Sequence, residues 1–178
     1  MDFCMPTGIE IERRYLIERP DEGRLISRYG AEIREIEQTY LVTPTGYSSE
    51  RVRSVFFRGE RSYTHTRKRR ISSASALEEE ETVDAARYRE LLLRADPERN
   101  VISKRRIAFF WKGQSYEIDL YPFWERVAIL ETELNDEGAV LSFPSEIKVL
   151  REITGFRELS NHALARRVPS EEKLLSLE

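Results

Sequence analysis

The sequence has a single cysteine, Cys4, and only two histidines. One cysteine cannot form an internal disulfide, which fits the reducing cytoplasm. So few sulfur and imidazole groups also cannot build a zinc site. We therefore expect any metal bound by this chain to be a hard, oxygen-coordinated ion such as Mg²⁺ or Mn²⁺.

Long hydrophobic runs are also missing. No apolar stretch approaches the roughly 20 residues that a membrane span needs. The N-terminus has no basic region followed by a hydrophobic block, so we expect neither a signal peptide nor a membrane partner. No Gly/Ser/Pro-rich linker divides the 178 residues. This length predicts a single domain, residues 1–178, with its core at about 8–167, and the single cysteine predicts that it is cytoplasmic.

The sequence also lacks an excess of charge of either sign. Charged residues make up 34% of the chain, yet the net charge is only −3. Acidic and basic side chains must therefore be interleaved, which argues against a nucleic-acid partner. Oligomeric state is not encoded in these patterns, and a homodimer stays an open alternative.

Short segments with strict alternation of side-chain character dominate the chain. Alternation with period two and β-branched or aromatic residues predict strands, while Asp21 and Asp84 are placed to cap helices. The result is a mainly β (α+β) fold. Strands are predicted at 8–18, 32–42, 49–57, 62–70, 77–83, 101–111, 114–121, 126–134 and 147–154, and helices at 22–29, 85–95 and 156–167.

Charged residues recur two positions apart on one face of these strands, beginning with Glu10, Glu12 and Arg14. One such face would be an ordinary solvated surface. Solvent-facing sheets seldom place like-charged pairs on strand after strand, however; here seven strands carry charged residues on such a face, six of them as like-charged pairs. The acidic members are Glu10, Glu12, Glu78, Glu80, Glu117, Asp119, Glu131 and Glu133; the basic members are Arg14, Arg51, Arg53, Lys68, Lys104 and Arg106.

A closed antiparallel sheet with its polar face turned inward would gather these pairs. Basic pairs would bind a row of phosphates, and acidic pairs would hold divalent cations that bridge the same phosphates. The pattern therefore indicates a small-molecule polyphosphate ligand.

The same residues resemble the CYTH, or triphosphate tunnel metalloenzyme, family. Its opening ExExK motif is similar to 10–14, and the order and spacing of later motifs agree from about residue 8 to residue 165. The matching segments are 10–16, 38–41, 51–53, 66–68, 78–80, 104–106, 117–119, 131–133, 152–154 and 161–165.

This resemblance implies an eight-stranded antiparallel closed β-barrel, flanked by a few helices, that hydrolyses a triphosphate with Mg²⁺ or Mn²⁺. It also implies roles by position. Phosphate would be bound by Arg14, Arg51, Arg53, Lys68, Lys104 and Arg106. The metal would be held by Glu10, Glu12, Glu80, Glu131 and Glu133. Catalysis would involve Glu10, Glu12, Arg14, Lys68, Glu78 and Asp119, with Glu117 orienting the bases.

Two positions depart from the family pattern. The lysine of ExExK is Arg14, which can bind phosphate but cannot exchange a proton near neutral pH. A tail position that is sometimes lysine is His162.

The predicted activity is metal-dependent hydrolysis of inorganic tripolyphosphate to pyrophosphate and phosphate. A class IV-type adenylate cyclase, a thiamine or nucleoside triphosphatase, and a non-catalytic polyphosphate or nucleotide binding module stay open as alternatives.

Overall fold

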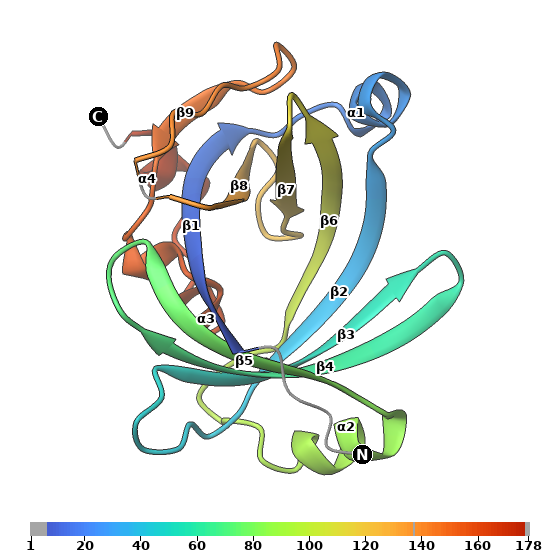
Figure 1. Ribbon diagram of the computed structural model, residues 1–178, viewed down its shortest axis with the longest axis vertical. Coiled ribbons are helices and arrows are strands. Elements are labelled where there is room, and N and C mark those ends of the chain that lie inside the picture. The colour runs from blue at the N-terminus through green and yellow to red at the C-terminus, as the bar shows by residue number, and fades with distance from the viewer. Residues whose placement is uncertain (1–6, 137, 177–178) are drawn as a thin grey trace.

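The computed structural model of the protein describes residues 7–136 and 138–176. Eight antiparallel strands form a closed barrel, and a ninth strand adds to its side, so the predicted barrel is confirmed. The strand order is β5-β4-β3-β2-β6-β7-β8-β1-β9, and a further β5–β1 pairing closes the ring (Figure 1). The strands are β1 (Thr7–Glu18), β2 (Glu32–Tyr40), β3 (Ser49–Phe57), β4 (Glu60–Arg70), β5 (Ser75–Val83), β6 (Ile102–Trp111), β7 (Gln114–Leu120), β8 (Val127–Leu134) and β9 (Val149–Glu152).

The first strand, β1, closes the barrel because it pairs with three others. Its residues 7–11 pair with β5, and its residues 11–18 pair with β8. The edge that β5 leaves free is taken up by β9, which pairs with residues 15–17. The charged opening segment of the sequence therefore lies at the seam of the barrel.

The first two helices begin where the sequence predicts. Asp21 accepts a hydrogen bond from the Arg24 backbone and starts α1 (Glu22–Tyr29), and Gly30, at φ 63°, ends it in the left-handed conformation that glycine tolerates. Asp84 caps α2 (Ala85–Leu92) in the same way. This helix ends earlier than predicted because 93–95 tighten into i→i−3 bonds and Ala95 forms a β-bridge with Leu41.

The predicted C-terminal helix at 156–167 is wrong. The segment forms a 3₁₀ turn, η1 (Arg157–Leu159), and one short helix, α3 (Asn161–Leu164). Ser160 separates them because its extended backbone and its side-chain bond to the Ala163 N–H make it an N-cap. A further helix, α4 (Glu171–Leu175), was not predicted. In Figure 1 the C-terminal elements lie beside β1, α1 lies near one end of β2, and α2 lies below β3–β5.

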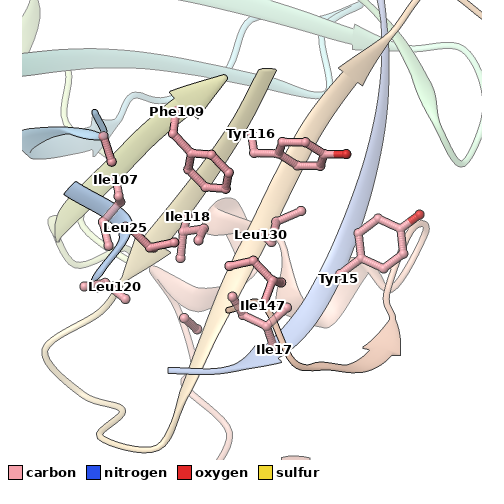
Figure 2. Close-up of a cluster of buried hydrophobic side chains, with 12 residues drawn as sticks. Tyr15, Ile17, Leu25, Ile107, Phe109, Tyr116, Ile118, Leu120, Leu130 and Ile147 are labelled. Atoms are coloured by element: carbon pink, nitrogen blue, oxygen red, sulfur yellow. The ribbon is translucent and has the colours of Figure 1, made fainter. Parts of the chain in front are cut away.

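Apolar side chains cover the outside of one half of the barrel. Tyr15, Ile118 and Leu130 belong to β1, β7 and β8 and pack with Leu25 of α1 and Ile147 (Figure 2). These residues alternate along the strands with the charged ones, so burial of the apolar face turns the charged face inward.

A second apolar cluster closes part of the inward-facing side. Leu16 and Ile129 are cross-strand partners on that side, and Leu159 and Leu164 of the C-terminal segment pack against them. The tail therefore contacts the same interior that carries the charged residues. None of the helices in the described ranges is long and apolar enough to cross a membrane.

Candidate functional site

Strand register places the predicted charged residues on one face, the interior face of the barrel. Directly paired residues of an antiparallel ladder project to the same side. Arg14 pairs with Glu131 and Glu12 with Glu133. The same holds, on other strand pairs, for Arg106 with Asp119, Lys68 with Glu78, Thr66 with Glu80, Arg51 with Thr66, and Glu117 with Glu131.

Arg106 is the centre of the buried charge network. Its Nε lies 2.7 Å from Asp119 Oδ1, and its Nη2 lies 2.8 Å from both Asp119 Oδ2 and Glu131 Oε2. Nη1 donates to Glu117. Burial alone would raise the pKa of Asp119, but Arg106 and Lys104 outweigh it and hold that pKa well below its ordinary value. Asp119 is therefore a fixed anion that orients two cations.

Lys104 is fully buried beside this network. Its Nζ lies 2.5 Å from Asp119 Oδ2 and 3.5 Å from Asn161 Oδ1. Burial lowers the pKa of Lys104 to about 8; Asp119 opposes that shift, and Arg106 adds to it. Asn161 also accepts a hydrogen bond from the Tyr121 hydroxyl at 2.7 Å. The tail segment therefore contacts Lys104, one of the residues predicted to bind phosphate.

The two arginines of β3, Arg51 and Arg53, differ in their negative partners. Arg53 makes no ion pair with any residue in the described ranges, and its side-chain hydrogen bonds go to the neutral Gln38. Burial, then Arg51 and Arg106, lower the pKa of Arg53 to about 10. Arg51 reaches Glu78 only at 3.8 Å, and its buried Nε has no hydrogen-bond partner. Burial acts to lower the pKa of Arg51, but Glu78 outweighs it and the pKa is raised, so Arg53 is the uncompensated charge of the two.

Carboxylates crowd the adjoining part of the interior face, which Glu78 connects to Arg51. Burial, then the neighbouring Glu78, raise the pKa of Glu10 to about 7, although Lys68 acts against this. Burial and Glu131 likewise raise the pKa of Glu12. Lys68 Nζ lies 2.7 Å from Glu78 and 3.6 Å from Glu10, and is the cation that these two acids share. Burial acts to raise the pKa of Glu78, but Arg51 and Lys68 outweigh it and lower the pKa, so Glu10 and Glu12 are the carboxylates whose charge is least compensated.

Arg14 joins the acidic region to the C-terminal segment. Its Nε lies 3.1 Å from Glu131 Oε1 and 3.4 Å from Glu12 Oε1, and its Nη2 donates to the Leu159 carbonyl at 2.8 Å. Burial acts to lower the pKa of Arg14, but Glu131 and Glu12 outweigh it and raise the pKa. Arg14 is therefore a fixed positive charge held between two carboxylates.

The acidic region has the carboxylate oxygens that a hard cation requires, although their present geometry does not form a coordination site. Among the residues described, no three or more acidic, histidine or cysteine side chains are arranged to hold an ion. Glu80 accepts a bond from Thr66 at 2.7 Å, and Glu133 is exposed. Glu10 and Glu12 have raised pKa values because they are buried among other carboxylates, an environment that fits a divalent cation.

Several interior residues carry no role in the sequence prediction. Gln38 and Tyr40 share one face of β2 within the matched segment 38–41, and Asn161 is the first residue of the matched tail segment. The sequence therefore showed that these residues belong to matched segments, but it did not show which side chains they contact. His162 packs edge-on against Tyr40 at 4.8 Å between ring centroids. Burial, followed by Arg99, lowers the pKa of His162.

A cavity of about 580 Å³ lies away from this charged network. It is lined by Arg13, Tyr15, Phe143 and Glu152 among others, all from outside the interior face. Arg13 and Tyr15 alternate with Arg14, so β1 separates the cavity from the candidate site. It contains none of the predicted site residues.

The fold is similar to solved structures of known proteins. The inorganic triphosphatase NE1496 is 26% identical, with 90% of this chain and 97% of that chain covered and a TM-score of 0.56. PH1819 from Pyrococcus horikoshii OT3 is 22% identical over 72% of this chain and 80% of its own, with a TM-score of 0.54. HpAC1 from Hippeastrum, which shows a dominant triphosphatase activity, is 16% identical over 71% and 80%, with a TM-score of 0.53.

Sequence comparisons alone find less. No protein-family model matches this chain, and no curated protein matches it. The structural similarities nevertheless confirm the predicted resemblance to the CYTH, or triphosphate tunnel metalloenzyme, family.

Proposed function

We propose that this protein is a metal-dependent triphosphatase that hydrolyses inorganic tripolyphosphate to pyrophosphate and phosphate. The observation that carries the proposal is Arg53, a buried cation on the interior face whose side-chain hydrogen bonds go to a neutral amide and which makes no ion pair in the described ranges, on the same face as a crowded set of carboxylates. A buried positive charge without a partner is costly. An anionic ligand would remove that cost.

The phosphate ligands would be the interior cations. Arg51 has a buried Nε without a hydrogen-bond partner, Arg53 bonds only a neutral amide oxygen, and guanidinium groups can bind phosphate oxygens with two parallel bonds. Arg106 and Lys104 are oriented toward the interior by Asp119, and Lys68 by Glu78. Arg14 adds a charge that cannot be lost at neutral pH. This arrangement neutralises a triphosphate and aligns it.

The divalent metal would be held by Glu10, Glu12, Glu131 and Glu133, with Glu80 beside them. These residues supply the hard oxygen ligands that Mg²⁺ and Mn²⁺ prefer. When bound, such an ion would neutralise phosphate oxygens and acidify a water molecule for attack on the terminal phosphorus. Phosphoryl transfer depends mainly on positioning and charge stabilisation, and the interior cations supply both.

The similarity to known structures supports the same activity. NE1496 is an inorganic triphosphatase, and it covers nearly the whole of this chain. The single cysteine and the absence of internal disulfides suit a cytoplasmic enzyme made of one domain, which we propose as well.

A phosphate-release screen tests the proposal. Tripolyphosphate, ATP and thiamine triphosphate are each incubated with Mg²⁺, Mn²⁺ or excess chelator, and cyclic AMP is assayed in the ATP samples. We expect kcat/KM to be highest for tripolyphosphate. We expect no phosphate release from any substrate when excess chelator is present. Tight binding of tripolyphosphate with no turnover under any metal would show a binding module, and cyclic AMP formation would show a cyclase.

A further inference from the structure

Thr64 of β4 carries a buried hydroxyl that the charged network does not use. Its Oγ1 has no hydrogen-bond partner among the residues that the structure describes. Thr66, the next residue on the same face of β4, differs because its hydroxyl donates to Glu80 Oε2 at 2.7 Å. A buried hydroxyl that makes no hydrogen bond costs folding free energy, so its presence in the interior needs an explanation.

Strand register places Thr64 beside Arg53, the uncompensated cation of the interior face. The two residues are direct cross-strand partners on β3 and β4, so their side chains project to the same side with Cβ atoms about 5 Å apart. Arg53 is in turn the direct partner of Gln38 on β2. Gln38, Arg53 and Thr64 therefore form a row across three neighbouring strands, which we call the β2–β4 row.

The β2–β4 row combines positive charge with a hydroxyl and contains no carboxylate. Arg53 directs two N–H donors at the neutral Gln38 oxygen, and a guanidinium has five. A phosphate group between Arg53 and Thr64 would pair the guanidinium and accept a hydrogen bond from the hydroxyl at the same time. A cation would be repelled by Arg53, and an apolar group would leave the hydroxyl unpaired. The row is therefore suited to an anion with several acceptor oxygens.

We propose that Thr64 is a substrate-binding residue whose hydroxyl donates a hydrogen bond to a phosphate group held by Arg53. The inference rests on the proposed function for the identity of the ligand, a triphosphate. It adds a neutral donor to a set of phosphate-binding residues that otherwise consists of lysine and arginine. Burial, then Arg51 and Arg106, already lower the pKa of Arg53, so another cation at position 64 would lower it further. A hydroxyl binds phosphate without that cost.

The test separates ligand binding from folding with closely matched variants. Thr64→Val removes the hydroxyl and keeps the β-branched shape, while Thr64→Ser keeps the hydroxyl. Thr82→Val is the control for the same chemical change, because Thr82 is the direct partner of Thr64 on β5 but is exposed. Dissociation constants for tripolyphosphate are measured by calorimetry without divalent metal, so that no turnover interferes. The Tm of each protein is measured without ligand.

We expect Thr64→Val to weaken tripolyphosphate binding by about tenfold, because a hydrogen bond to a charged ligand is lost. Its Tm should not fall, since the missing hydroxyl makes no hydrogen bond to the residues described. Thr64→Ser should bind within about threefold of the parent, because the serine hydroxyl is an equivalent donor. The Thr82→Val protein should match the parent in both measurements.

Parental binding in the Thr64→Val protein would overturn the proposal. A weakening that Thr64→Ser or Thr82→Val shares, or that comes with a lower Tm, would also overturn it, because the cause would then be altered packing of the strands. The proposed function fails separately. If the parent binds tripolyphosphate but releases no phosphate with any metal, hydrolysis is wrong, and a selective loss of binding in Thr64→Val still assigns Thr64 to the phosphate site.

Discussion

Arg53 donates two hydrogen bonds to a single neutral oxygen, Gln38 Oε1, from Nε at 3.2 Å and from Nη2 at 2.9 Å. The Gln38 amide nitrogen in turn donates to the Tyr40 hydroxyl at 2.7 Å. This amide fixes the orientation of Arg53 without neutralising its charge. A carboxylate at the same place would do both.

Gln38→Glu should therefore weaken anion binding and stabilise the fold. The new carboxylate would pair with Arg53, raise its pKa from about 10 and relieve its repulsion by Arg51 and Arg106. We expect the dissociation constant for tripolyphosphate to rise at least about tenfold, since the guanidinium is then already paired. Calorimetry and thermal melts measure the two effects. Unchanged binding together with a higher Tm would show that Arg53 does not contact the ligand.

The pH dependence of kcat/KM should reflect the deprotonation of Lys104. Its pKa of about 8 means that the amine loses its charge in mildly alkaline solution, so kcat/KM for tripolyphosphate should fall above about pH 8. Unfolding would not explain this fall. Because the folded-state pKa lies below the ordinary 10.5, the cost of the buried charge is fully present below pH 8, and the Lys104 contribution to stability improves as pH rises toward 10.5.

Lys104→Arg is the control for that profile. Arginine keeps its charge throughout this range, so the alkaline fall should move upward even if the absolute rate is lower. A fall that stays near pH 8 in the arginine variant would assign it to another group.

Substitutions of Arg14 separate fixed charge from proton transfer. Arg14→Lys retains a charge between Glu12 and Glu131 and should keep kcat/KM within about tenfold. Arg14→Ala should cost about 2–4 kcal/mol of transition-state stabilisation, as for other preorganised charges. Steady-state kinetics at saturating metal measure both, with folding checked because Arg14 also bonds Leu159. Parental activity in the alanine variant would place Arg14 outside the site.

Glu12→Gln should reduce metal-dependent turnover by at least about tenfold, because one charged ligand is removed. The same change relieves repulsion between Glu12 and Glu131, so the Tm without metal should not fall. Mg²⁺ or Mn²⁺ should raise the Tm of the parent by mass action and raise that of the variant less. Turnover that survives exhaustive chelation would contradict the metal requirement.

The interior face could be predicted because its signal is local. Alternation along each strand, as in Glu10, Glu12 and Arg14, is visible in a few residues and shows which side chains share a face. Two capped helices were equally predictable, since Asp21 and Asp84 act on backbone groups within three residues.

Contacts between distant segments could not be predicted in this way. The tail pattern at 156–167 reads as one helix, yet Ser160 interrupts it and brings Asn161 to Lys104. Glu133 shares the parity of Glu131 but is exposed while Glu131 is buried, because their depth depends on where the strand lies in the barrel. Odd or even position along a strand determines which face of the sheet a side chain occupies, but it does not determine how deeply that side chain is buried.

The position of β1 at the barrel seam has a consequence for synthesis. Arg14 is synthesised 117 residues before its partner Glu131. Domains of this kind, dominated by pairings distant in sequence, fold slowly because loop-closure entropy is lost before the contacts form. Until β8 has been synthesised, the edge of β1 that pairs with β8 has no partner, and the acidic residues of β1 lie along this strand. The charged side chains of β1 would then deter pairing with other nascent chains, so the residues proposed to bind metal would also protect the protein during its own assembly.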